Sequence, residues 1–145
     1  MVHLFEDLPS FALRVAAASV CNMACVYCPQ PNMENLTPRR HRDRPINHGM
    51  FQRIMSNLLR AVPFEKVSFT GGEPLTNPRL HELASTAYEL VPRVELNTNG
   101  VLLNARRWQQ LSPWFKQVKI SIDTLDAGEF TALTAYKGAH GLRRF

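Results

Sequence analysis

The apolar positions of this 145-residue chain follow two alternating repeats, one typical of strands and one typical of helices. Phe11, Leu13 and Val15 recur at every second position and are followed by small residues, which predicts a strand that ends just before residue 21. From residue 48 to residue 62 the apolar positions instead recur every three or four residues. This spacing predicts a helix with one buried face and with Asn47 as its N-cap.

The same alternation continues through the rest of the chain. Strands are predicted at residues 66–70, 93–97 and 118–122, and helices are predicted to begin near Asn77, at Asn104 and at Asp126. Because strands separated by helices form parallel sheets with right-handed crossovers, the sequence predicts an α/β fold. The carboxyl ends of parallel strands share one edge of the sheet, so we expect the polar residues that follow each strand to meet there.

Composition and charge narrow the function classes only slightly. Apolar residues make up 45% of the chain, which suits one globular domain, and the formal net charge of +5 weakly favours anionic partners. No apolar run approaches the roughly 18 residues that cross a bilayer, so we expect no association with a membrane. The segment MVHLFEDLPS lacks the features of a secretory signal, which favours a cytoplasmic location.

A basic run from Arg39 to Arg44 raises nucleic-acid binding as one alternative. The run lies in the proline-rich stretch 29–47, which is predicted to be a loop, and no aromatic residues are interleaved with its charges. We therefore interpret the run as part of a solvated loop and do not expect a nucleic-acid partner.

All the cysteines of the chain lie in the eight residues CNMACVYC, with the spacing C-x3-C-x2-C. Clustered cytoplasmic thiols stay reduced and bind metal more often than they form disulfides. A structural zinc site would need a fourth ligand such as His41 or His48, and three unrelated buried thiols are a further alternative. A [4Fe–4S] cluster fits better, since three thiolates hold three irons and leave the fourth open for a ligand. Met23, Ala24 and Val26 are expected to line such a cluster.

This cysteine pattern resembles the signature loop of the radical S-adenosylmethionine (SAM) superfamily, in which an aromatic residue, here Tyr27, precedes the third cysteine. The resemblance extends to VSFTGGEPL at 67–75, NTNG at 97–100 and KISIDTLD at 119–126. Within the superfamily the chain is most similar to the GTP cyclases of molybdenum-cofactor biosynthesis. The resemblance implies a partial (β/α) barrel of which the chain supplies about four of six β-α units. Residues 1–145 would then form a radical SAM core domain that is incomplete at its C-terminus.

The resemblance also implies two cofactors and a reaction. Cys21, Cys25 and Cys28 would hold the [4Fe–4S] cluster, and SAM would bind to the open iron. Reductive cleavage of SAM would give a 5′-deoxyadenosyl radical that abstracts hydrogen from a small-molecule substrate, such as a nucleotide. The electron would come from a donor protein such as flavodoxin or ferredoxin.

By the same resemblance, seven residues are expected to bind SAM: Tyr27, Gly71, Gly72, Glu73, Thr98, Asn99 and Ser121. The two glycines would let the backbone approach the methionine moiety, Glu73 would help to neutralise its ammonium group, and Tyr27 would lie near the adenine. Simpler interpretations stay open. The GGEP segment could be an ordinary turn, and Tyr27 could be a core aromatic. The polar residues beside Gly100 could likewise form a turn.

Two further residues are candidate substrate contacts. Arg14 precedes Cys21 by seven residues, where the GTP cyclases have an arginine that contacts phosphates; the alternative is a solvent-facing or salt-bridged arginine. Asp123 is expected on the same face of the fourth strand as Ser121, and its alternative role is that of a turn residue at the strand end.

The chain also departs from the cyclase pattern. Ser68 and Asn77 occupy two positions where the cyclases have arginine, and the sequence has no further cysteines for the second cluster of that group. These differences keep two alternatives open: a radical SAM enzyme that modifies a peptide or a sugar-type metabolite, and a truncated, non-catalytic metal-binding fragment. Since the sequence ends in GLRRF within a predicted helix, we expect a C-terminal half to be supplied elsewhere.

Overall fold

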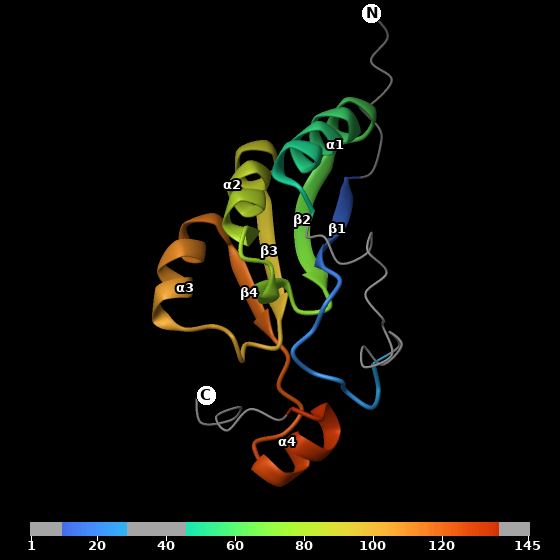
Figure 1. Ribbon diagram of the computed structural model, residues 1–145. Helices are drawn as coiled ribbons and strands as arrows, with labels where there is room; N and C mark the ends of the chain where they lie inside the picture. Colours follow the sequence, from blue (N-terminus) through green and yellow to red (C-terminus); the bar gives the residue numbers. More distant parts are fainter. Residues whose placement is uncertain (1–9, 29–45, 137–145) are drawn as a thin grey trace, which may run out of the picture.

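A computed structural model describes residues 10–28 and 46–136, which form one parallel sheet and the helices that follow its strands (Figure 1). The sheet has the order β1-β2-β3-β4 and consists of β1 (Phe11–Ala18), β2 (Phe64–Gly71), β3 (Arg93–Thr98) and β4 (Gln117–Ile120). The helices are α1 (His48–Ala61), α2 (Leu80–Leu90), α3 (Ala105–Leu111) and α4 (Ala127–Thr134), with short 3₁₀ turns η2 (Pro74–Thr76) and η3 (Ser112–Trp114). All the strand pairs are parallel, so the predicted α/β fold is confirmed.

Helices α1, α2 and α3 cover one face of the sheet, here called the helix face (Figure 1). Val67 and Phe69 of β2 point to this face, and both are 0% exposed. The ring of Phe69 has its centroid 5.9 Å from that of Phe51 in α1 and 6.0 Å from that of Phe115. Ser68 lies between these two core residues and therefore points to the opposite side of the sheet, here called the open face.

Side-chain caps start three of the helices where the sequence predicts them. Asn47 Oδ1 accepts a hydrogen bond from the backbone N–H of Met50 at 3.2 Å, and Asn104 Oδ1 accepts one from Arg107 at 3.0 Å. Asp126 caps α4 by accepting from two backbone N–H groups of its first turn, at 2.8 and 2.9 Å. Each cap satisfies donors that have no partner inside the helix. None of the helices within residues 10–28 and 46–136 is long and apolar enough to cross a membrane.

Helix α2 begins later than predicted. Asn77 is expected to cap it, yet the helix begins at Leu80. The side chain of Asn77 instead donates to the carbonyl oxygen of Ala17 at 2.8 Å and accepts from the backbone N–H of Arg79 at 2.9 Å. A contact with β1 thus holds Asn77 in the turn before the helix, which no local pattern reveals.

Strand β4 is shorter than predicted because it ends at Ile120. The backbone N–H of Ser121 still donates to the carbonyl oxygen of Thr98 at 3.0 Å. The chain then leaves the sheet toward α4. Ser121 and Asp123 therefore follow the strand rather than share one of its faces, which corrects that expectation.

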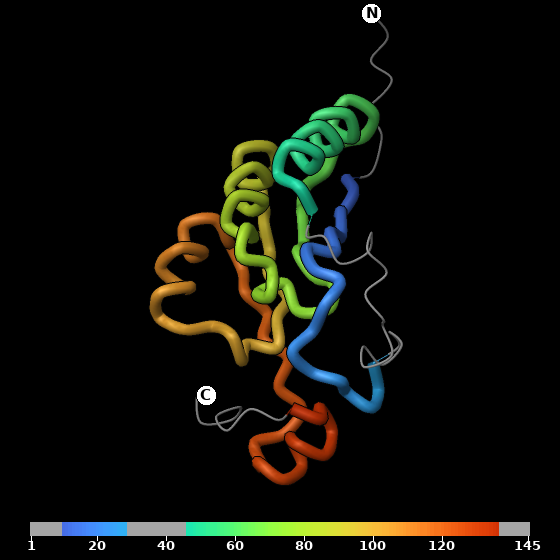
Figure 2. The backbone as a smooth tube through the Cα atoms, in the orientation of Figure 1, coloured from blue at the N-terminus to red at the C-terminus, as the bar shows by residue number. Residues whose placement is uncertain are grey.

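The segments that follow the four strands meet at the carboxyl edge of the sheet, as predicted. Figure 2 shows the segment after β1 and helix α4 together beyond this edge. Residues 19–28, here called the cysteine loop, contribute Met23 to an apolar cluster with Val101 and Phe130. The cluster joins the cysteine loop, the turn after β3 and α4 into one unit.

Candidate functional site

The cysteine loop rests on the end of β2 through backbone contacts. The N–H groups of Gly72 and Glu73 donate to the carbonyl oxygens of Ala18 and Val20, both at 2.9 Å. A Cβ atom on Gly72 would lie only 2.2 Å from the Val20 oxygen, and one on Gly71, whose φ is +126°, would lie 2.3 Å from the Ala18 oxygen. Glycine is therefore required at both positions for the loop to reach the strand. The expected approach of these glycines to SAM stays a prediction.

Helix α4 holds the other side of the cysteine loop. The backbone N–H groups of Ala24 and Val26 donate to the carbonyl oxygens of Thr134 and Leu133, at 2.8 and 2.9 Å. These carbonyls belong to the last turn of α4, where no partner exists inside the helix. The loop is thus fixed from two sides without the use of a thiol. The side chain of Val26 is 71% exposed, and the expectation that it lines a cluster stays a prediction.

The three free thiols differ in exposure, since Cys21 and Cys25 are half-buried and Cys28 is exposed. Cys21 and Cys25 contact the apolar cluster described above. Burial raises the pKa of the Cys21 thiol; a hydrogen bond from the backbone of Met23 partly offsets this rise, and Glu73 and the other two thiols add to it. A metal ligand has to be the thiolate, so a bound cation would have to offset this rise.

The donor set fits an iron–sulfur cluster. Within residues 10–28 and 46–136, no three side chains of His, Cys, Asp or Glu gather closely enough to hold a single metal ion. A cubane cluster needs no such convergence, because each thiolate binds a different iron. His48, one candidate fourth ligand for zinc, lies 2.7 Å from Thr86 Oγ1 and 3.9 Å from Glu82 through its two ring nitrogens. The other candidate, His41, and the basic run at 39–44 lie outside the described residues.

Glu73 joins the ends of β2 and β3. The residue is 1% exposed, and its carboxylate accepts hydrogen bonds from Thr98 Oγ1 at 2.6 Å and from the backbone N–H of Asn99 at 2.8 Å. It also accepts from the N–H of Leu75 at 2.9 Å. Three predicted SAM-binding residues thus form one hydrogen-bonded unit. The contact of Glu73 with the ammonium group of SAM stays a prediction.

The side chain of Asn99 connects this unit to the cysteine loop. Asn99 Nδ2 donates to Asn22 Oδ1 at 2.8 Å and lies 4.0 Å from the sulfur of Cys21. Sequence reasoning missed Asn22, although its position directly after the first cysteine is a usable signal. It also missed the role of α4, whose carbonyl contacts leave no trace in the sequence.

Tyr27 and Asp123, which lie 96 residues apart, meet beside the cysteine loop. The phenol O–H of Tyr27 donates to the carboxylate of Asp123, and this bond, followed by burial, raises the pKa of Tyr27. The side chain of Tyr27 is 56% exposed, so its interpretation as a core aromatic is wrong. The contact links the cysteine loop to the segment after β4, which also carries Ser121. The side chain of Ser121 is exposed.

The open face of the sheet carries a buried carboxylate among cations. Glu95 is 1% exposed, and its Oε2 accepts from Lys119 at 3.0 Å and from Ser68 Oγ at 3.2 Å, with Lys66 at 3.7 Å. Burial by itself would raise the pKa of Glu95, but these contacts outweigh it and lower the pKa. Arg14 is exposed on β1 in register with Ser68, so it shares this face.

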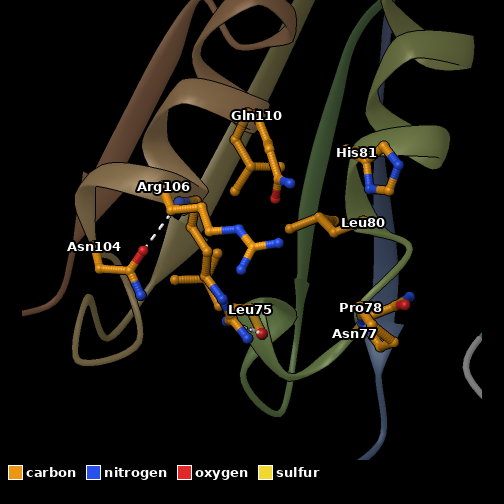
Figure 3. A pocket seen from close by; sticks show the side chains of 10 residues that line it. Leu75, Asn77, Pro78, Leu80, His81, Asn104, Arg106 and Gln110 are labelled. Carbon is orange, nitrogen blue, oxygen red and sulfur yellow. Dashed lines mark hydrogen bonds between the residues drawn. The ribbon is translucent and has the colours of Figure 1, made fainter.

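A cavity of about 330 Å³ lies apart from these residues, between η2, α2 and α3 (Figure 3). Its polar lining residues are Asn77, His81, Asn104, Arg106, Arg107 and Gln110. Figure 3 shows the side chain of Arg106 reaching across the cavity toward Leu80. None of the predicted cofactor- or substrate-binding residues lines this cavity.

Comparison with protein families identifies the family of the chain that carries this edge. A family model described as the radical SAM superfamily matches residues 17–143, a range that includes the cysteine loop and every predicted SAM-binding residue. The chain belongs to the radical SAM superfamily. The membership predicted from the cysteine loop is therefore confirmed.

The curated relatives that this radical SAM chain matches include GTP 3',8-cyclases. The one from Mycobacterium marinum (strain ATCC BAA-535 / M) is 34% identical over 124 residues, which cover 84% of this chain and 34% of that relative. The one from Chlorobaculum tepidum is 31% identical over 125 residues, which cover 84% of this chain and 36% of that relative. The predicted similarity to the cyclase group is confirmed, and the chain spans about a third of the length of these relatives.

Solved structures share the radical SAM fold of this chain. The structure of Streptococcus suis SuiB bound to S-adenosylmethionine matches with a TM-score of 0.69 at 19% identity, over 88% of this chain and 28% of that chain. The complex of BtrN with AdoMet and 2-DOIA matches with a TM-score of 0.61 at 22% identity, over 94% of this chain and 55% of that chain. Such identities show the fold alone, and they confirm the predicted architecture.

Proposed function

We propose that the chain forms the part of a radical SAM enzyme that holds a [4Fe–4S] cluster and SAM. The cysteine loop carries this proposal: backbone hydrogen bonds to β2 and α4 fix it, so that Cys21, Cys25 and Cys28 stay free as ligands. When bound, the cluster and SAM supply a 5′-deoxyadenosyl radical that abstracts a hydrogen atom from the substrate.

The remaining residues of the carboxyl edge are assigned to SAM. Glu73 holds Thr98 and the backbone of Asn99 in place, which supports a rigid site beside the thiols. The exposed ring of Tyr27 is held at its hydroxyl by Asp123, which supports its assignment to the adenine. The resemblance to the family adds Gly71, Gly72 and Ser121 to the same set.

We assign a small anionic substrate, such as a nucleotide, to the open face. Two observations support this class: the curated relatives are named GTP 3',8-cyclases, and Arg14, Lys66 and Lys119 share the face with a single described carboxylate, that of Glu95. A face with excess positive charge attracts anions. The reaction further requires an electron donor such as flavodoxin or ferredoxin. Thiols that serve as metal ligands have to stay reduced, which supports the cytoplasm as the place of action.

A peptide or a sugar-type metabolite is the second candidate substrate. Ser68 stands where the GTP cyclases have arginine, and its hydroxyl donates to Glu95. Serine at this position supplies no cation, which favours a substrate without a triphosphate group. Asp123, whose carboxylate accepts a hydrogen bond from Tyr27, is the candidate contact for a polar substrate of this kind.

Anaerobic reconstitution with iron and sulfide tests the cofactor assignment. We expect about four irons and four sulfides per chain and an EPR signal of the reduced cluster that changes when SAM is added. With dithionite and SAM, 5′-deoxyadenosine should form, and a Cys28→Ala variant should form none. Zinc in place of iron, or an EPR signal that SAM does not alter, would contradict the proposal.

Addition of GTP separates the two substrate classes. GTP should increase the yield of 5′-deoxyadenosine, and Arg14→Ala should remove that increase while the response of the EPR signal to SAM persists. Arg53→Ala on the exposed side of α1 is the matched control and should behave as the wild type. Equal yields with and without GTP would favour the peptide or sugar-type substrate.

A further inference from the structure

A fixed backbone donor orients two side-chain amides at the carboxyl edge. The N–H of Val101 donates to Asn99 Oδ1 at 3.1 Å, so the amide nitrogen of Asn99 has to face the other way. That nitrogen donates to Asn22 Oδ1 at 2.8 Å. The orientation of the Asn22 amide follows, because its oxygen faces Asn99 and its nitrogen must face away.

The amide nitrogen of Asn22 is buried and has no partner. Within residues 10–28 and 46–136, Asn22 Nδ2 stands alone among buried side-chain nitrogen and oxygen atoms in making no hydrogen bond. An unsatisfied buried donor costs about 1–3 kcal/mol, and such groups in native proteins point to an ion, a water or a functional role. The amide belongs to the residue after Cys21, and its oxygen lies 3.8 Å from the Cys21 sulfur.

We propose that Asn22 is a positioning residue for the cluster and donates its free side-chain N–H to a sulfur atom of that cluster. The inference rests on the proposed function, since it needs a cluster held by Cys21, Cys25 and Cys28. Thiolate and sulfide sulfurs carry negative charge and accept hydrogen bonds. Such bonds are one of the means by which a protein sets the reduction potential of a cluster.

The hydrogen bonds that connect Glu73, Asn99 and Asn22 fix the orientation of the Asn22 amide. Glu73 holds the backbone N–H of Asn99 at 2.8 Å, and the side chain of Asn99 holds the amide of Asn22 at 2.8 Å. A donor that is fixed in advance needs no reorganisation when charge develops near it. It stabilises the reduced, more negative cluster more than the oxidised one. Asn22 therefore raises the reduction potential.

A redox titration of the reconstituted protein, followed by EPR, tests the role of Asn22. Asn22→Leu removes the donor at similar volume and adds no charge. We expect the midpoint potential to fall by an amount that corresponds to a roughly tenfold change in the equilibrium constant for one-electron reduction, about 59 mV. Asn57→Leu on the exposed side of α1 is the matched control and should leave the potential unchanged.

Asn99→Asp is a second variant whose effect the amide relay predicts. The new carboxylate accepts both from Val101 and from the amide nitrogen of Asn22, so the Asn22 amide turns and presents its oxygen to the loop. The potential should fall here too, beyond the change in Asn57→Asp, which adds the same charge at a distance. An exchangeable proton coupled to the reduced cluster in the wild type should be lost in both Asn22→Leu and Asn99→Asp.

The outcomes distinguish this inference from the proposed function. If the wild type assembles no cluster, both fail. If the cluster assembles and responds to SAM, but Asn22→Leu leaves the potential and the proton coupling unchanged, only the role of Asn22 is overturned. Should Asn22→Leu fail to fold, Asn99→Asp, which keeps the side-chain volume, decides by the loss of the exchangeable proton coupling, because its new charge near the Cys21 sulfur lowers the potential by itself.

Discussion

The helix face of the sheet and its carboxyl edge are held together by different interactions. On the helix face, Phe51, Phe69 and Leu96 are at most 1% exposed, and burial of apolar area stabilises their contacts. At the edge, hydrogen bonds of the cysteine loop and of the Glu73 carboxylate provide the order. The first region depends on volume and shape, and the second combines a small apolar cluster around Met23 with individual donors and acceptors. Stability and ligand binding can therefore be altered separately.

Cys25→Ala should have the largest effect of these variants, and that effect should be limited to cluster assembly at the carboxyl edge. Loss of one of three thiolates should abolish assembly of a [4Fe–4S] cluster, as measured by iron and sulfide content. The free energy of unfolding of the metal-free protein should change by less than about 1 kcal/mol, because the backbone holds the loop. A variant that keeps full iron content would contradict the separation of the two regions.

Phe69→Ala should have the opposite effect: it should destabilise the fold but leave cluster assembly intact. Removal of this buried ring should lower the free energy of unfolding by about 3–5 kcal/mol, as measured by urea denaturation. The fraction that stays folded should still assemble the cluster, because the thiols lie in another part of the molecule. If the folded fraction assembled no cluster, the two regions would be coupled.

Gly72→Ala sharpens the comparison because it tests where the loop touches the sheet. The added methyl group would meet the Val20 oxygen at 2.2 Å, so we expect a loss of about 1–3 kcal/mol together with weaker iron binding. Gly49→Ala in the first turn of α1 is the matched control: its Cβ would meet Asn47 Oδ1 at 3.4 Å, an ordinary contact. Equal stability of the two variants would show that the loop tolerates displacement from β2.

Glu95→Gln should leave the carboxyl edge intact and should destabilise the fold in a way that depends on pH. The pKa of Glu95 is lowered in the folded state, so its ionised form stabilises the fold above the ordinary pKa and this contribution is lost as the pH falls through the folded value. At pH 7 the variant should lose about 1.5–3 kcal/mol of unfolding free energy. The difference from the wild type should shrink below about pH 4. A difference that is constant with pH would contradict the charged role.

The order of strands and helices could be predicted because burial imposes a visible period on the sequence. Phe51 and Met55 lie in the core as their helical spacing predicts. The errors occur where a distant contact overrides a local signal. Asn77 is a good cap by composition, but its side chain donates to Ala17 of β1, and the helix begins later.

The candidate site was predictable only where its residues form a short motif. The three thiols stand out by type and spacing, whereas Glu73 and Asn99 were predicted through the resemblance of their motifs to the radical SAM family. The bond of Tyr27 to Asp123, and the bonds of the cysteine loop to the last turn of α4, join residues far apart in the sequence. Such pairs carry no local signal, because the partners lie far apart in the sequence and, for the α4 contacts, any residue supplies a backbone carbonyl. The steric requirement for glycine at position 72 could not be predicted either, because the atom that a Cβ would meet belongs to the backbone of the cysteine loop.

If the proposed cluster binds to the cysteine loop, the backbone contacts of that loop with α4 would couple cluster binding to the order of a helix that carries none of the ligands. The amides of Ala24 and Val26 complete the last turn of that helix. Whatever binds the loop more tightly in the native state than in the unfolded chain stabilises α4 by linkage. Amide hydrogens of α4 should then exchange more slowly once iron is bound, and chelation should make this segment the first target of proteases.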